Sequence, residues 1–283
     1  MDKPFFYILI RSWKTFDYFE NCINSVFNQR YKNYKILYID DASGYSNKQK
    51  KRIQVKLNKH IVIFNRIRKY SVYNGFYMIY NYAKKRNSIC LILDGDDWLL
   101  DKNTLLYISK LYESREISLT YGSCLFWDGK RYLKNHPLYS STMNTKYPKK
   151  VIKKRLFRLE PFRVSHPMTF KTSLFKMIKQ KDFKDESGEW LKYEHDLASF
   201  LPMLEMESTK FVFIKKPLYV YNTVSPNLNI KKSPYELAKE ELIIRKKDIY
   251  DILHGLKSPW FRPLRENDTS SSIPPSSRTR RFP

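Results

Sequence analysis

Three aspartates within four residues form the strongest chemical pattern in the sequence. The run Leu91-Ile-Leu-Asp-Gly-Asp-Asp-Trp98 puts Asp94 and Asp96 two residues apart, so on an extended strand end their carboxylates point the same way. Two such oxygen ligands suit one Mg²⁺ or Mn²⁺ ion, which would bridge the phosphates of a nucleoside diphosphate and neutralise its charge as it leaves. Gly95 would let the backbone approach a bulky ligand closely. The plainer alternative is a polar turn that caps the next helix.

The elements that must position these aspartates alternate between strands and helices in the first hundred residues. This alternation predicts an α/β fold with a mostly parallel central sheet flanked by helices. The predicted strands are nearly continuous apolar runs, as strands buried on both faces should be: Phe5–Ile10, Lys35–Ile39, Ile61–Phe64 and Ile89–Leu93. The predicted helices cover 16–27, after a Thr15 cap, Lys48–Leu57, Gly75–Lys85 and Asn103–Glu113.

Each predicted strand ends in polar residues, and in such a sheet ligands bind outside the carboxyl ends of the strands. Arg11 follows the first strand and Arg66 the third, where either could meet a pyrophosphate or simply add surface charge. Asp40 and Asp41 close the second strand. A carboxylate there could accept a hydrogen bond from a nucleobase N–H or a ribose hydroxyl, or could cap the loop.

The pattern after Leu119 is different. Asp128-Gly129 predicts a turn between strands Leu119–Trp127 and Lys130–Leu133. Residues 134–160 are basic and show little periodicity, which predicts a surface loop. A helical region surrounds Glu194–Met206, followed by strand-like runs Phe211–Ile214 and Leu218–Tyr221. Ser233-Pro234-Tyr235-Glu236 predicts the start of a helix that runs to about Leu253. Residues 257–283 are expected to form a disordered basic tail.

These ordered motifs resemble family 2 glycosyltransferases. The similarity rests on Tyr38-Ile-Asp-Asp-Ala-Ser43, Asn74-Gly75 and Leu93-Asp-Gly-Asp-Asp-Trp98, and covers roughly residues 4–225. It implies a GT-A fold, with 1–254 as the transferase domain, 1–118 as its nucleotide-sugar-binding half and 119–254 as its acceptor-binding half. By the same resemblance Asp41 would meet the nucleobase, Asp94 the ribose side of the donor, and Asp96 the metal, with Asn74 also in the donor site.

The resemblance also implies a catalytic carboxylate at the start of a helix. Glu194 and Asp196 in Tyr193-Glu-His-Asp-Leu-Ala198 match it, and Asp196 is preferred as the base that takes the acceptor proton. Helix-dipole stabilisation is the simpler role for both. His166 could contact donor phosphates, metal or acceptor, although a lone histidine more often has a structural role. Trp98, Trp127 and Trp190 could stack on a sugar ring, but for at least two of them we expect core packing instead.

Composition sets wider limits. The net charge of +25 is spread along the chain and would attract polyanions, but it forms no stripe beside a nucleic-acid-binding motif, so we expect no nucleic-acid partner. Cys22, Cys90 and Cys124 suggest buried, reduced thiols of a cytosolic protein. The apolar run Phe5–Ile10 is far shorter than the ~20 residues of a membrane span or a signal segment. We therefore expect a protein that is cytoplasmic or touches membranes peripherally through its basic surface.

The prediction is an inverting glycosyltransferase that uses Mn²⁺ or Mg²⁺. It would move a sugar from a nucleoside-diphosphate donor, a UDP-sugar by preference, to a hydroxyl of a glycan, lipid or protein acceptor. One alternative is a nucleotidyltransferase on a related sheet, although Arg11-Ser-Trp-Lys14 lacks the glycines of a phosphate loop. The other is a non-catalytic basic binding protein on a degenerate transferase fold.

Overall fold

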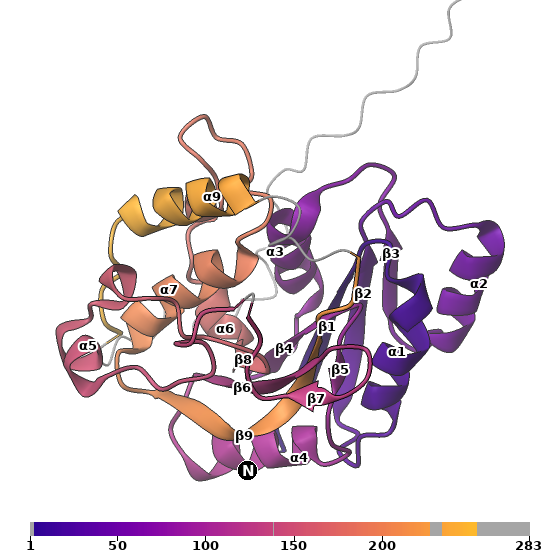
Figure 1. Cartoon of the computed structure of the whole chain (residues 1–283), viewed down its shortest axis with the longest axis horizontal. Helices are drawn as coiled ribbons and strands as arrows, with labels where there is room; N and C mark the ends of the chain where they lie inside the picture. Colours follow the sequence, from indigo (N-terminus) through magenta and orange to yellow (C-terminus); the bar gives the residue numbers. More distant parts are fainter. Residues whose placement is uncertain (1–2, 138, 227–233, 254–283) are drawn as a thin grey trace, which may run out of the picture. The chain divides into compact units, whose positions relative to one another are not determined.

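The apolar runs of the first hundred residues form the parallel part of one sheet in the computed structural model (Figure 1), which describes residues 3–137, 139–226 and 234–253. β1 (Phe6–Ser12), β2 (Tyr34–Asp40), β3 (Ile61–Phe64) and β4 (Ile89–Asp94) lie in the order β3-β2-β1-β4 and are all parallel. These ranges confirm the four predicted strands to within two residues. Their carboxyl ends therefore meet at one edge of the sheet.

The sheet continues through strands from the second half of the chain. β4 is followed by β8 (Met168–Lys171), β6 (Leu119–Trp127), β9 (Phe211–Asn222) and β5 (Trp98–Leu99), while β7 (Tyr132–Leu133) pairs with β6. β8 runs antiparallel to both of its neighbours, but β6 and β9 share a long parallel register. Because the long registers are parallel, the expectation of a mostly parallel sheet flanked by helices is confirmed.

Helices cover both faces of the sheet (Figure 1). The first face carries α1 (Phe19–Phe27), α2 (Asn47–Lys56) and α4 (Thr104–Ser114), whose apolar residues share one core cluster with β1 and β4. The opposite face carries α3 (Tyr70–Tyr82), α6 (Thr172–Phe175) and α7 (His195–Glu207), with α9 (Pro234–Lys246) packed on α7. The remaining short helices are η1 (Phe16–Tyr18), α5 (Lys149–Lys154), η2 (Phe157–Leu159) and η3 (Gln180–Phe183).

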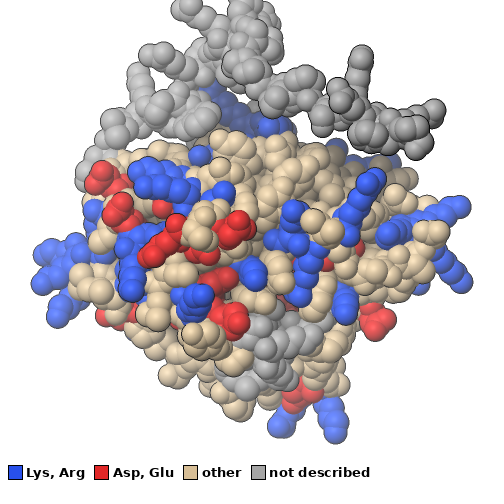
Figure 2. All heavy atoms as spheres, turned by 90° about the horizontal axis from the view of Figure 1, so that it is seen from above, with Lys and Arg blue, Asp and Glu red and all other residues tan. Residues whose placement is uncertain are grey.

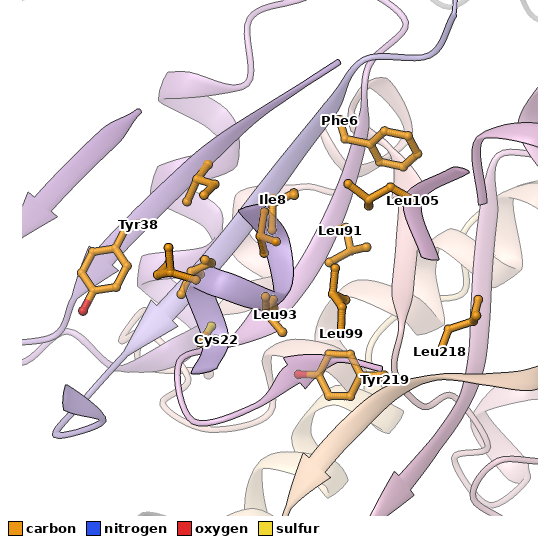
Figure 3. Close-up of a cluster of buried hydrophobic side chains, with 14 of the residues drawn as sticks. Phe6, Ile8, Cys22, Tyr38, Leu91, Leu93, Leu99, Leu105, Leu218 and Tyr219 are labelled. Atoms are coloured by element: carbon orange, nitrogen blue, oxygen red, sulfur yellow. The ribbon is translucent and has the colours of Figure 1, made fainter. Parts of the chain in front are cut away.

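The alternation of side chains along β1 explains this double cover. Phe6 and Ile8 are fully buried in the cluster that also holds Cys22 of α1 (Figure 3). Tyr7 and Leu9 point to the other face, where α3 packs against β1. A strand buried on both faces must be apolar throughout, which is why the sequence of β1 is a continuous apolar run.

Several predicted elements differ from the observed ones for reasons that lie outside their own sequence. α3 begins at Tyr70 instead of Gly75 because the distant carboxylate of Asp41 accepts hydrogen bonds from the backbone N–H groups of Lys69 and Tyr70. Thr15 is not a side-chain cap: it precedes η1, and its hydroxyl bonds with Ser12 instead. The presumed loop 134–160 contains α5 and η2, each too short to show a helical period.

The second half shows further differences. The two strand-like runs after residue 210 are one strand, β9, whose register with β6 shifts around Ser123. The Asp128-Gly129 turn is confirmed, and the Asp128 carboxylate accepts bonds from the N–H groups of Lys130 and Arg131. α9 ends at Lys246, well before Leu253. The predicted cap Ser233 and the tail 257–283 lie outside the described residues.

All of these elements belong to one compact unit, Met1–Ile252. Cys22, Cys90 and Cys124 are buried free thiols, as expected. Over residues 3–137, 139–226 and 234–253, no helix has both the length and the apolar character needed to cross a bilayer.

Candidate active site

A cavity of about 420 Å³ opens at the carboxyl ends of β1, β2 and β4. One wall comes from the first half of the chain and includes Arg11, Asp41 and Asp94. The opposite wall comes from the second half and includes His166 and Asp196. The sheet edge therefore gathers the predicted polar residues from distant segments, as the position of their strands requires. On the face seen from above, Lys and Arg side chains surround a smaller group of Asp and Glu side chains (Figure 2).

Arg11 and Asp94 are register partners at the ends of the adjacent parallel strands β1 and β4, so their side chains emerge side by side. The Arg11 Nε and Nη2 atoms donate hydrogen bonds of 2.9 and 2.7 Å to Asp94 Oδ1. Arg11 Nη2 also lies 3.5 Å from Asp196 Oδ1. One largely buried guanidinium thus contacts both the carboxylate of the predicted donor site and the carboxylate of the predicted base.

His166 lies between the same two carboxylates. Its Nε2 is 3.9 Å from Asp94 Oδ2 and 3.8 Å from Asp196 Oδ2. The imidazole stacks on the ring of Tyr219 with 4.5 Å between ring centroids, and burial lowers its pKa, which favours the neutral ring. His166 therefore belongs to the polar centre of the cavity as well as to its packing.

Asp196 occupies the first turn of α7. Burial alone would raise its pKa, but the positive charge of Arg11 and a hydrogen bond with His195 outweigh it and hold the pKa below its usual range. The Nδ1 atom of His195 is 3.3 Å from Asp196 Oδ1. Asp196 is consequently an ionised hydrogen-bond acceptor at neutral pH.

The Asn74-Gly75 pair serves this carboxylate indirectly. A Cβ atom on Gly75 would lie 2.1 Å from the Nε2 atom of His195, so the histidine ring packs directly over the glycine. Any other residue at 75 would displace the ring that contacts Asp196. Glycine is therefore needed at this position of α3 because the imidazole of His195 occupies the space that a side chain would fill.

Glu194, immediately before α7, also lines the cavity. Burial and the negative charges of Asp196, Glu241 and Glu240 raise its pKa to about 8. At neutral pH the two predicted catalytic carboxyl groups therefore differ: Asp196 is ionised and Glu194 is largely protonated.

Asp96 and Asp97 are adjacent but have different surroundings. Asp97 is buried, and it accepts hydrogen bonds of 2.8 Å from the Tyr219 hydroxyl and from the backbone N–H of Asn222. These bonds tie the end of β4 to β9. Asp96 lines the cavity, where burial and the charge of Asp94 raise its pKa to about 6.

The pair Asp94 and Asp96 fits a divalent cation that arrives with its substrate. Within the parts of the chain that the structure describes, no three His, Cys, Asp or Glu side chains form a metal cage. Mg²⁺ is commonly held by one or two carboxylates together with substrate phosphates. A cation beside Asp96 would also relieve the repulsion that raises the pKa of this residue.

Asp41 and Asn74 both reach the cavity and are held rigidly. Asp41 Oδ1 accepts bonds from the backbone N–H of Lys69 (2.7 Å) and the amide of Asn65 (3.1 Å), while Oδ2 accepts one from the N–H of Tyr70 (2.9 Å). Asn74 Oδ1 accepts a 2.9 Å bond from the same Asn65 amide. Much of the acceptor capacity of Asp41 is therefore used to anchor α3.

Three residues predicted for the donor site are absent from the cavity lining. Asp40 is buried and accepts bonds from the hydroxyl and N–H of Ser43, the turn-capping alternative. Arg66 is exposed. Gly95 faces the chain instead of a ligand, because a Cβ there would lie 2.6 Å from Thr15 Oγ1 and 2.9 Å from the Arg11 carbonyl.

The cavity also contains residues that the sequence analysis did not select. Arg68 stacks on Trp13, with 3.5 Å between the guanidinium carbon and the ring centroid, and lies 4.3 Å from the centroid of Tyr70. Arg68 is two residues beyond the predicted Arg66 and lines the cavity. Trp98 contacts Trp127, and Trp190 packs against Tyr73 and Phe76.

Comparisons with known proteins identify the class to which this fold and site belong. The family model "Glycosyl transferase family 2" matches residues 7–179, more than half of the chain, and the chain therefore belongs to glycosyl transferase family 2. A search of curated proteins found no match.

Solved structures of similar architecture support the same assignment. TarS 1-349 of S. aureus in complex with UDP-GlcNAc aligns with a TM-score of 0.53 and 14% identity, over 78% of this chain and 59% of that one. TarS 1-349 without a named ligand gives 0.56 and 14%, over 87% and 67%. The mannosyltransferase PcManGT of Pyrobaculum calidifontis, in complex with GDP-Man and Mn²⁺, gives 0.53 and 13%, over 88% and 66%. These likenesses confirm the GT-A fold, and the chain spans 59% of the length of the first TarS structure.

Proposed function

We propose that this chain is an inverting glycosyltransferase that transfers a sugar from a nucleoside-diphosphate donor, a UDP-sugar by preference, to a hydroxyl of a glycan, lipid or protein acceptor. The observation that carries the proposal is the Arg11, Asp94, His166 and Asp196 array on one cavity at the carboxyl ends of the strands. TarS bound to UDP-GlcNAc and PcManGT bound to GDP-Man support a nucleotide-sugar donor.

The two walls of the cavity suggest how the substrates divide between the halves of the chain. We assign donor binding to residues 1–118, with Asp41, Asn74, Arg68 and Asp94 on their wall, and acceptor binding to residues 119–254. The aromatic and apolar residues of the second wall, such as Tyr139, Phe162 and Tyr221, suit the flat apolar face of a sugar. Peripheral contact with an anionic membrane through the basic surface fits a lipid-linked acceptor.

Asp94 and Asp96 would hold Mn²⁺ or Mg²⁺, which would supply positive charge for the departing diphosphate. Arg11 neutralises Asp94 and orients it through two hydrogen bonds to one carboxylate oxygen. The buried, neutral His166 adds a hydrogen-bonding group between the donor and acceptor sides. Together these residues would fix the anomeric carbon of the donor opposite Asp196.

Asp196 is the proposed base. As the acceptor oxygen attacks the anomeric carbon, its proton passes to a carboxylate oxygen of Asp196, the bond from that carbon to the diphosphate oxygen breaks, and the configuration inverts. Arg11 and His195 keep Asp196 ionised and oriented. Glu194 is the alternative base and would first have to lose its own proton.

The test of this function is a thermal-shift panel of UDP-, GDP- and dTDP-sugars with and without Mn²⁺. Binding to the folded state raises the unfolding temperature by mass action, so we expect at least one donor to stabilise the protein more when Mn²⁺ is present. The Asp96→Ala variant should lose the metal-dependent part and keep its fold. A wild-type protein that no donor stabilises, or an Asp96→Ala variant that responds as the wild type does, contradicts the proposal.

A further inference from the structure

The segment Lys192–Glu194, which leads into α7, is held by a side chain from a distant helix. Glu240 of α9 is buried, and its two carboxylate oxygens accept hydrogen bonds from three consecutive backbone N–H groups. The distances are 2.6 Å from Lys192, 2.9 Å from Tyr193 and 3.0 Å from Glu194. A buried carboxylate that accepts three backbone donors is a rigid anchor, because every bond is charge-assisted.

The carbonyl groups of the same segment are held from the opposite side by α3. The Ser71 N–H donates a 3.0 Å bond to the Lys192 carbonyl. The Ser71 hydroxyl lies 2.9 Å from the Lys192 carbonyl oxygen and 3.0 Å from that of Tyr193. The segment is thus clamped between Glu240 and Ser71. Ser71 follows Tyr70, whose N–H is bonded to Asp41, so the clamp is continuous with the donor wall.

The clamped segment carries the residues that face the reacting groups. Lys192, Tyr193, Glu194 and Asp196 all line the cavity, and Leu237 of α9 lines it beside them. α9 lies beyond residues 7–179, the part of the chain that the family model matches. Nothing in the match assigns this helix a role, yet it borders the cavity.

We propose that Glu240 is a positioning residue for the transfer reaction: it fixes the backbone of Lys192–Glu194 and thereby aims Glu194 and Asp196 at the acceptor. The inference rests on the proposed function. Misplacement of a catalytic group by about 1 Å can cost about 100-fold in rate, so loss of the clamp acts on turnover. The donor-wall residues Asp41 and Asn74 keep their own hydrogen bonds to Asn65, so donor binding is expected to change less than turnover.

The experiment compares the wild type with Glu240→Gln, Ser71→Ala and Glu236→Gln. Glutamine keeps the size of Glu240 but can accept on one side only, so at least one of the three backbone bonds is lost. Ser71→Ala weakens the same clamp from the carbonyl side. Glu236→Gln is the matched control, since Glu236 lies on the same helix, four residues before Glu240, and is exposed.

The readouts are kcat and donor KM for nucleoside-diphosphate release, with active sites counted by the stoichiometry of nucleoside-diphosphate binding. We expect Glu240→Gln and Ser71→Ala to lower kcat per site about tenfold or more with KM within about twofold of wild type, and Glu236→Gln to resemble the wild type. If Glu240→Gln does not fold, the kcat per site and the KM of Ser71→Ala decide whether the clamp positions the catalytic groups.

Three outcomes contradict the inference. If the wild type turns over donors and both clamp variants keep its kcat per site, Glu240 has no positioning role and the proposed function stands. Glu240 also has no positioning role if the variants lose total activity only in proportion to the number of their binding sites. If the wild type releases nucleoside diphosphate from no donor, the proposed function fails and the inference fails with it.

Discussion

At the scale of single residues, the cavity depends on one guanidinium group that lies between two carboxylates. Arg11 contacts Asp94 and Asp196, which come from segments a hundred residues apart in the chain. The sequence indicated Arg11 and Asp94 because strand ends are readable as local patterns, and it indicated Asp196 through the resemblance to family 2 glycosyltransferases. Arg68 and the clamp by Glu240 could not be predicted, since their partners Trp13 and Lys192 are distant in sequence and only the fold brings them together.

The identity of the base can be read from the pH dependence of kcat/KM. Arg11 and His195 hold the pKa of Asp196 below its usual range, so with Asp196 as base the rate should show no ionisation of the base between about pH 6 and 8. With Glu194 as base, whose pKa is raised to about 8, kcat/KM would rise with pH up to about 8. Asp196→Asn should lower kcat by about 100-fold or more, and Glu194→Gln far less. The reverse order would contradict the assignment.

We expect the ionised Asp96 side chain to lower the free energy of unfolding. Its pKa is raised to about 6 by burial and by Asp94, so folding disfavours its ionised form. This cost is fully present above about pH 6, decreases as the pH falls, and disappears below about pH 4, where the group becomes protonated in both states. Without divalent metal, Asp96→Asn should therefore raise the melting temperature at pH 7.5 by about 2–4 °C and much less at pH 4.5.

A control for the Asp96 prediction is Asp101, whose pKa is lowered by hydrogen bonds from Asn103. Asp101→Asn should change stability in the opposite direction, by a smaller amount because the group is near the surface. A lower melting temperature for Asp96→Asn at pH 7.5 would show that Asp96 is stabilised by its surroundings.

Gly75 provides a test of the packing behind Asp196. The methyl group of Gly75→Ala would lie 2.1 Å from His195 Nε2, and the ring is fully buried. Such overpacking costs about 1–3 kcal/mol of unfolding free energy, measured by chemical denaturation. The double variant Gly75→Ala with His195→Ala removes the clash, so the two changes should be less costly together than their sum. Additive costs would refute the contact.

At the scale of elements, prediction succeeded where a segment is stabilised by its own pattern. β1, β2 and β4 are buried on both faces and read as apolar runs. β8 was missed because Met168–Lys171 is not a continuous apolar run and takes its place through pairing with β4 and β6. The predicted start of α3, Gly75, lies after the observed start at Tyr70. The first N–H groups of this helix bond to Asp41, which is distant in the sequence.

A buried ion pair joins three of these elements. Arg158 of η2 donates bonds of 2.6 and 2.9 Å to the two carboxylate oxygens of Glu205 on α7, and also bonds the Ile244 carbonyl of α9. Removing one partner leaves a buried charge, so Glu205→Gln should cost about 3–5 kcal/mol of unfolding free energy. Glu20→Gln, which breaks the exposed pair with Arg52, should cost less than about 1 kcal/mol. Equal costs in chemical denaturation would contradict this account.

At the scale of the whole molecule, the two parts of the chain meet at one cavity. The sheet edge supplies Asp41 and Asp94, and the segments around β8 and α7 supply His166 and Asp196. The family could be predicted from the sequence because the strand-end motifs have a fixed order along it. Which sugar and acceptor fit the cavity could not, because the shape of the second wall depends on residues such as Tyr139 and Phe162 in irregular segments.

The most direct test of the central claim is release of nucleoside diphosphate from UDP-, GDP- and dTDP-sugars with Mn²⁺, by the wild type and by Asp96→Asn and Asp196→Asn. The account predicts release from at least one donor by the wild type and a loss of about 100-fold or more in each folded variant. No release from any donor, or undiminished release by either variant, would contradict it.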